Sequence, residues 1–192
     1  MNKKSLAKVK VLINGYTTAD SKEADEEKTC ATITLIKDGK LVMVIDSGVL
    51  ESRKMLIDAL KKEKLSLEDV NVVGLTHSHI DHYASVGMFP NAKILEFYGL
   101  WDKNKCDEWN EQFTNNIRII KSPGHDKTGI TFLVKTNKGI MAVCGDVFWK
   151  ENYPKNDPYA DNPKKLKETR KNILKLADWI VPGHAGMYRV LH

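Results

Sequence analysis

The segment that decides the fold spans residues 76–82 and reads Thr-His-Ser-His-Ile-Asp-His. Three imidazoles and one carboxylate this close together cannot be buried without specific partners. The segment follows a short apolar run that we predict to be a strand, so the chain turns here and His77 and His79 can face one metal ion. Asp81 and His82 begin the next predicted helix and can face a second ion. Imidazole nitrogen and carboxylate oxygen suit zinc, and also iron or manganese. The alternative is a histidine-rich loop that binds nothing.

Further polar residues follow predicted strands elsewhere in the chain. His125 and His184 each end a Pro-Gly-His tripeptide, in which Pro and Gly make a sharp turn and direct the next side chain to the sheet edge. Asp146 follows Gly145 in the same way, after a buried run. Five of the six histidines therefore lie in turns after predicted strands, and the sixth, His192, is assigned no role.

Counting these side chains gives two metal sites. The first comprises His77, His79, His125 and Asp146, and the second comprises Asp81, His82, His184 and the same Asp146. Two ions about 3.5–4 Å apart can hold a bridging hydroxide, which is a nucleophile at neutral pH. We expect Asp81 also to position this hydroxide and to accept its proton. A structural zinc site would instead be closed and usually rich in cysteine.

One order of elements occurs in both halves of the chain: hairpin, aspartate, amphipathic helix, short strand and histidine. In the first half these elements are the apolar runs 31–36 and 41–45 around Asp38-Gly39, Asp46, a helix over 49–64 and a strand over 71–75. In the second half they are the runs 130–135 and 140–144, Asp146, a helix from Asn162-Pro163 and a strand over 178–181. Such a duplication predicts two similar halves packed together. We expect an α+β fold, a four-layer α/β/β/α sandwich of two mixed sheets with helices outside, as a single domain over residues 1–192.

The composition is that of an ordinary globular chain. It has 192 residues, 29% of them charged and 42% hydrophobic, and a formal net charge of +5, which weakly favours anionic substrates. Three cysteines at no metal-like spacing favour a reducing compartment over a disulfide scaffold. No apolar run approaches the roughly 20 residues that span a bilayer, and the basic start at Met1–Lys4 lacks the apolar stretch of a signal peptide. We therefore expect a cytoplasmic protein with no membrane partner.

The pattern H-x-H-x-D-H, followed by His, Asp and His in this order and spacing, resembles the metallo-β-lactamase superfamily. The resemblance covers nearly the whole chain. Residues 145–148, Asp157-Pro158 and the C-terminal segment 181–191 are similar to a branch of short members, the group of metallo-β-lactamase domain-containing protein 1. The resemblance implies the fold given above and a dizinc hydrolase with the same ligands. It also implies that Asp46 is oriented toward the metal histidines, because ligating histidines usually donate their other nitrogen to a carboxylate or carbonyl. The alternative for Asp46 is a turn residue that caps the following helix.

The chain also departs from the pattern of some relatives. Ala185 follows His184, where many relatives have Gly. Asp146 stands where the antibiotic-resistance enzymes use a Cys ligand, and Cys144 is interpreted as a packed strand residue. The large insertion of the nucleolytic branch is missing from the sequence.

Three short loops are predicted to form the walls of the site: residues 15–28, 99–113 and 150–162. Their aromatic residues could line a substrate pocket, although Trp101, Trp109 and Phe113, with Cys106, fit the packed core of a helix better. Lys150, Asn152, Tyr153 and Tyr159 follow Asp146 on a loop that should overhang the site edge, and nothing in the sequence selects one of them. Tyr188 and Arg189 lie beyond His184, where either could reach a bound carboxylate or phosphate.

These features favour a dinuclear-zinc hydrolase that uses the bridging hydroxide on ester-, thioester- or β-lactam-like small molecules, with little discrimination among them. The alternative is a metal-dependent ribonuclease or phosphodiesterase that acts on RNA. A third hypothesis is a metal-binding domain without catalysis, and the full ligand set argues against it.

Overall fold

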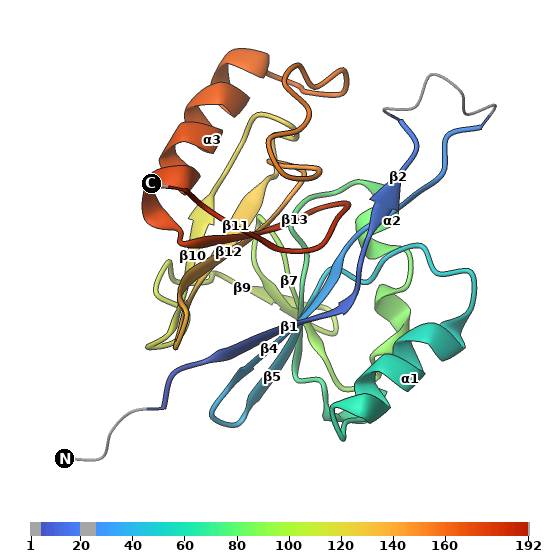
Figure 1. Ribbon diagram of the computed structural model, residues 1–192. Coiled ribbons are helices and arrows are strands. Elements are labelled where there is room, and N and C mark those ends of the chain that lie inside the picture. The colour runs from blue at the N-terminus through green and yellow to red at the C-terminus, as the bar shows by residue number, and fades with distance from the viewer. Residues whose placement is uncertain (1–4, 20–25, 192) are drawn as a thin grey trace.

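The computed structural model describes residues 5–19 and 26–191. The predictions for Met1–Lys4, for the middle of the loop 15–28 and for His192 fall outside these residues. Figure 1 shows two β-sheets that lie between helices on opposite outer faces. The α+β sandwich predicted from the sequence is therefore confirmed.

The N-terminal half builds the larger sheet, which has seven strands in the described part of the chain. In spatial order these are β1 (Lys8–Ile13), β4 (Ile33–Asp38), β5 (Leu41–Ile45), β6 (Val72–Gly74), β7 (Lys93–Leu95), β8 (Leu100–Asp102) and β9 (Lys105–Asp107). The predicted hairpin is confirmed: β4 and β5 pair antiparallel from Thr34↔Ile45 to Asp38↔Leu41, and Gly39 takes the left-handed turn conformation at φ 61°. β6 then joins β5 in parallel.

The C-terminal half builds the second sheet by the same steps. Its five described strands are β10 (Ile117–Lys121), β11 (Ile130–Thr136), β12 (Gly139–Gly145), β13 (Trp179–Pro182) and β14 (Tyr188–Arg189). As in the first half, the hairpin β11–β12 is antiparallel and the strand after the helix, β13, is parallel to β12. A small ribbon, β2 (Tyr16–Thr17) with β3 (Thr29–Cys30), stands apart from both sheets.

Two amphipathic helices cover the outer faces. α1 (Arg53–Lys62) buries Leu56 and Leu60, and α3 (Pro163–Leu176) buries Leu166, Thr169 and Ile173. The helix predicted over 49–64 is shorter than expected, because Ser52 caps it by accepting a hydrogen bond from the Lys54 amide. Among the described residues, no helix is both long and apolar enough to cross a bilayer.

A shared apolar core joins the two sheets. Ile36, Met43 and Ile45 of the larger sheet pack with Phe132 and Val143 of the smaller one in a single buried cluster. The single domain over residues 1–192 stays a prediction, which this common core supports. Short helical segments complete the fold: α2 (Ile80–Tyr83) and two 3₁₀ turns, Leu67–Asp69 and Val86–Met88.

The structure corrects one expectation for the segment 99–113. Trp101 and Cys106 lie on the paired strands β8 and β9 and not on a helix. Trp109 and Phe113 do pack against the core between the sheets, as expected of core residues. None of these four residues lines the pocket at the histidine cluster described below.

Candidate metal centre

Every residue predicted as a metal ligand follows the C-terminal end of a strand or begins the helix behind it. His77 and His79 follow β6, while Asp81 and His82 belong to α2. Residues 125, 146 and 184 follow β10, β12 and β13 in the other sheet. Because these strand ends meet at one edge of the sandwich, the two halves bring their polar side chains together. The seven side chains form two adjacent groups that could each hold a metal ion: His77, His79, His125 and Asp146, and Asp81, His82 and His184.

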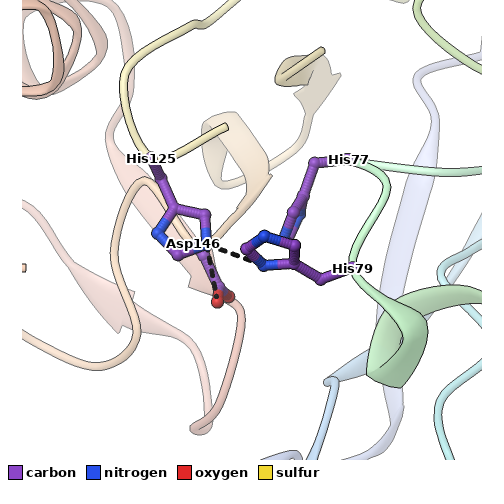
Figure 2. Close-up of side chains that lie close together, drawn as sticks. All are labelled: His77, His79, His125 and Asp146. Carbon is purple, nitrogen blue, oxygen red and sulfur yellow. Dashed lines mark hydrogen bonds and ion pairs between the residues drawn. The ribbon is translucent and has the colours of Figure 1, made fainter. Parts of the chain in front are cut away.

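Figure 2 shows the first group, in which the three imidazoles and the carboxylate point toward one another. His125 Nε2 lies 3.0 Å from His79 Nδ1 and 3.5 Å from Asp146 Oδ2. Four ligands arranged tetrahedrally at the usual zinc distance of about 2.0–2.1 Å would lie roughly 3.3 Å apart. The spacing of these atoms is therefore that of ligands around one ion.

The second group contacts the same carboxylate. His184 Nε2 lies 3.1 Å from Asp146 Oδ2, and His82 Nε2 lies 3.3 Å from Asp146 Oδ1. Asp81 Oδ2 is 3.6 Å from His184 Nε2 and accepts a hydrogen bond of 2.9 Å from the Thr29 hydroxyl. Asp146 thus lies between the two groups, in the position of a carboxylate that bridges two ions.

Local backbone geometry fixes this placement of Asp146. Gly145 adopts φ 51°, a left-handed conformation that side chains disfavour, and a Cβ there would collide with the Thr76 side chain. A Cβ on Gly183 would collide with the Asp146 carboxylate itself. The glycines before Asp146 and His184 are therefore needed for close approach as well as for the turn.

Each of the five histidines has a second polar contact, on the ring nitrogen that faces away from the centre. His82 Nδ1 lies 2.8 Å from Asp46 Oδ2, and His125 Nδ1 lies 2.7 Å from Asp157 Oδ2. The other contacts are His184 Nδ1 with the Cys30 carbonyl at 3.1 Å, His77 Nδ1 with the Thr76 hydroxyl at 3.1 Å, and His79 Nε2 facing Asp126 at 3.9 Å. Such outer contacts orient the imidazoles of metal sites and fix their tautomers.

Asp46 is placed as the sequence suggested. It holds φ 57°, a strained left-handed conformation for a residue with a side chain. From there its carboxylate accepts hydrogen bonds from the Thr76 amide at 2.8 Å and the Thr76 hydroxyl at 2.9 Å. Asp46 therefore holds both the loop that carries the H-x-H-x-D-H motif and the His82 ring.

Sequence reasoning missed the contacts of Asp157 and Asp126. Asp157 was noted only for its likeness to a family branch, and Asp126 was not singled out. The Asp157 side chain is fully buried, and its Oδ1 accepts the Tyr159 amide at 2.9 Å. One carboxylate thus holds both the His125 ring and the loop that carries Tyr159. In the sequence, the only signal for Asp157 is an acid in a polar loop. Its burial is visible only in the structure.

Burial and neighbouring charges shift the pKa values of the clustered histidines and of Asp146 in opposite directions. Burial lowers the pKa of His77 well below its usual value, and neighbouring His82 adds to this effect. Burial also disfavours charge on His82, but Asp46 and Asp146 outweigh it and raise the pKa of His82 well above the usual value. For Asp146, burial is outweighed by His82 and His184, which hold its pKa well below the usual range. The carboxylate is therefore ionised, as a metal ligand must be.

Three buried atoms at the centre make no regular hydrogen bond: His77 Nε2, and the pair His82 Nε2 and Asp146 Oδ1, which face each other at 3.3 Å. Buried polar atoms are almost always paired in proteins, and an exception calls for a reason such as a bound ion. Acceptor nitrogens and carboxylate oxygens converge here, and all are groups that bind zinc and similar metals. The donor set therefore fits a pair of metal ions.

A pocket of about 230 Å³ opens onto this cluster. Five of the seven candidate ligands, His79, Asp81, His125, Asp146 and His184, form its floor, and its walls are Thr17, Ala19, Glu27, Thr29, Ile80, Trp149 and Tyr159. Of the side chains on the loop 150–162, Tyr159 lines this pocket. Tyr188 and Arg189 line a different cavity, beside the end of α3. Cys144 packs in the core with its thiol toward the Val181 carbonyl, and burial raises its pKa, as expected of a packed strand residue.

Comparison with known proteins identifies the family. The sequence model of a protein family, the metallo-beta-lactamase superfamily, matches residues 31–99. Metallo-beta-lactamase domain-containing protein 1 of Xenopus laevis is 31% identical over 196 residues, which cover 95% of this chain and 82% of the frog protein. The chain therefore belongs to the metallo-β-lactamase superfamily, and it is a metal-dependent hydrolase of that class.

More distant comparisons agree on the fold. Metallo-beta-lactamase domain-containing protein 1 of Mus musculus is 30% identical over 78% of this chain, although the match spans only 61% of the mouse protein. A metallo-β-lactamase-like protein of Thermotoga maritima has a TM-score of 0.76 at 19% identity and covers 96% of this chain and 99% of its own. B. thuringiensis AiiA, solved with N-decanoyl-L-homoserine bound at the active site, has a TM-score of 0.69 at 14% identity, with 94% and 93% covered.

Proposed function

We propose that the chain is a dinuclear zinc hydrolase that acts on small ester-, thioester- or β-lactam-like substrates. The observation that carries this proposal is the convergence of five imidazoles and two carboxylates on two adjacent points, with three buried atoms that make no regular hydrogen bond. A protein gains nothing from such an arrangement unless cations compensate it, because unpaired buried polar atoms are costly.

The proposed ligands are those of the two groups. His77, His79 and His125 would hold one ion, His82, His184 and Asp81 would hold the other, and Asp146 would be shared by both sites. When bound, the ion pair supplies an activated water as nucleophile and a Lewis acid for the attacked carbonyl. The positions left open on a catalytic site, unlike a closed structural one, are where water and substrate enter.

Asp81 is the residue proposed to take part in proton transfer. Its carboxylate reaches the floor of the pocket, where Oδ2 accepts the Thr29 hydroxyl and faces His184 Nε2. The hydrogen bond from Thr29 holds the carboxylate in one orientation. From this position Oδ2 can accept the proton of the attacking water and later release it to the leaving group.

Two structural neighbours support an acyl substrate. AiiA was solved with an acyl homoserine at its active site, and AidC, a dizinc quorum-quenching lactonase solved with such a product, has a TM-score of 0.62 over 90% of this chain and 79% of its own. The net charge of +5 is the observation that favours the alternative, a metal-dependent ribonuclease or phosphodiesterase acting on RNA.

A panel assay on zinc-loaded protein tests the proposal. A phenyl ester, a thioester, a cephalosporin, a phosphodiester and an RNA oligonucleotide would be compared on one preparation, with Asp146→Ala as the matched inactive control. We expect turnover of the acyl compounds that the Asp146→Ala variant loses. Cleavage of the phosphodiester or RNA alone would favour the alternative, and no turnover of any substrate would contradict the proposed function.

A further inference from the structure

The described residues around the pocket over the histidine cluster provide no cation. Its described lining contains no lysine or arginine, although the whole sequence carries 30 of them. Enzymes that bind carboxylates or phosphates usually supply Arg or Lys for this purpose. Among the described residues, the lysines and arginines therefore lie outside this pocket lining.

The wall of the pocket carries an acid instead. Glu27 is an exposed residue in the pocket lining, and its carboxylate accepts a hydrogen bond of 2.5 Å from the Tyr159 hydroxyl. This contact joins the N-terminal half, which carries Glu27, to the loop after Asp146. The neighbouring cation Lys28 forms its ion pair with Glu26, at 3.8 Å, and not with Glu27. The Tyr159 phenol that donates this hydrogen bond is uncharged, so it adds no positive charge beside the Glu27 carboxylate.

Apart from the hydroxyl-bearing Thr17 and Thr29, the remaining described wall is aromatic and aliphatic. Trp149 is buried between the rings of His125 and His184, at centroid distances of 6.4 and 6.2 Å. Tyr159 stacks on Trp149 with centroids 5.9 Å apart and planes 20° apart. Ile80 stands opposite on the motif loop, 61% exposed. These surfaces favour an apolar substituent and carry no cation that would compensate an anionic group, although the Trp149 Nε1–H is a donor without a hydrogen-bond partner.

We propose that Glu27 makes this site select small uncharged acyl esters over anionic ones. This inference rests on the proposed function and deepens it by naming the charge of the substrate. Ions at the floor of the pocket would draw both kinds of ester to the same place, and the acid at the rim opposes only the charged one. In this chain, the wall repels negative charge at the rim and offers an apolar surface below it.

The expected size of the effect follows from Coulomb's law. If the Glu27 carboxylate and the anionic group of an ester lie about 8 Å apart, in surroundings intermediate between protein surface and water, their repulsion lowers kcat/KM for that ester by about five-fold. Exposed charges are screened beyond a Debye length of about 10 Å at 0.1 M salt and about 3 Å at 1 M. The discrimination should therefore be clear at low salt and should weaken at 1 M salt.

Two esters of the same shape provide the test: 4-acetoxybenzamide, which is uncharged, and 4-acetoxybenzoate, which is anionic. The kcat/KM of zinc-loaded protein would be measured for both, each divided by its rate of hydrolysis by hydroxide. We expect wild type to favour the amide-bearing ester at low salt, and Glu27→Gln to reduce the ratio by about five-fold. The matched control is Glu26→Gln, an adjacent exposed acid outside the pocket lining, which should leave the ratio unchanged.

The outcomes separate the two proposals. Equal or faster turnover of the benzoate by wild type would overturn the inference while leaving the hydrolase function intact. The same ratio in wild type and in Glu27→Gln would also overturn it, as would an equal effect of Glu26→Gln. Failure to hydrolyse either ester would overturn the proposed function and the inference together.

Discussion

The imidazoles of the cluster are held from outside by residues that are not ligands themselves. Asp157 illustrates this, because its buried carboxylate contacts His125 Nδ1 through one oxygen and the Tyr159 amide through the other. Loss of the charge would leave the His125 ring free to choose the wrong tautomer. It would also loosen the loop beside the pocket.

Asp157→Asn is therefore expected to weaken metal binding or activity by about 10- to 100-fold, the usual range for such outer contacts. Metal titration and kcat/KM would measure the loss. Asp161→Asn is the matched control on the same loop, because the Asp161 carboxylate accepts the Lys127 amide, at 2.9 Å, and the bond from its backbone amide to the His125 carbonyl is kept in the variant. If both variants behaved like wild type, the proposed role of Asp157 would be wrong.

Asp146 and Cys144 provide a second comparison between neighbouring residues. Asp146 lies between both groups of ligands, whereas the Cys144 side chain is buried in the apolar cluster that contains Leu166 and Ile173 of α3. Asp146→Ala should lower the bound metal and abolish hydrolysis. Cys144→Ala should leave metal content unchanged. Because it removes only a small buried thiol, it should lower the free energy of unfolding by about 1 kcal/mol. Greater loss of metal in Cys144→Ala would contradict the ligand assignment.

At this scale the sequence revealed the residues whose chemical type is itself unusual. Histidines and acids directly after apolar runs are conspicuous, so all seven side chains of the two groups could be predicted. Asp157 could not, because its partner His125 is 32 residues away in sequence. That contact depends on how two loops pack, and no local pattern encodes it.

At the scale of elements, helices and strands with clear turn or cap residues could be predicted from the sequence, whereas short strands without them could not. The two hairpins and α3 carry turn and cap residues, and they form as predicted. By contrast, β7, β8 and β9 have three residues each, too few for an apolar alternation to be read. Trp101 and Cys106 therefore resembled helix core residues, whereas they pair with each other on β8 and β9.

The start of α3 supplies a prediction about stability. Asn162 accepts the Lys165 amide at 2.9 Å through its side chain, and its own amide donates to the Gly124 carbonyl beside His125. Asn162→Ala should lower the free energy of unfolding by about 1 kcal/mol, the usual loss of a helix cap. Asn172→Ala, on an exposed position of the same helix, should cost nothing, because Ala is the better helix former. Equal losses in chemical denaturation would contradict the capping role.

At the scale of the whole molecule, the two halves meet at the cluster. The first half provides His77, His79, Asp81 and His82, and the second provides His125, Asp146 and His184. Bound ions would therefore connect the two sheets at one edge, in addition to the apolar core between them. Binding to the folded state alone stabilises it by mass action.

Metal removal should for this reason lower the melting temperature. A ligand at about 1,000 times its Kd contributes roughly 4 kcal/mol, which corresponds to a shift of about 10 °C in a chain of this size. Calorimetry before and after chelation, and after zinc is restored, would measure it. A melting temperature that chelator and zinc both leave unchanged would argue against ions that link the halves.

The central claim is that this chain holds two metal ions between its halves, and elemental analysis of metal-replete protein tests it most directly. We predict close to two equivalents of transition metal per chain, mainly zinc, and a clear loss of metal in Asp146→Ala, which removes the proposed bridge. A value near zero in wild type, or two equivalents retained in full by Asp146→Ala, would contradict the account.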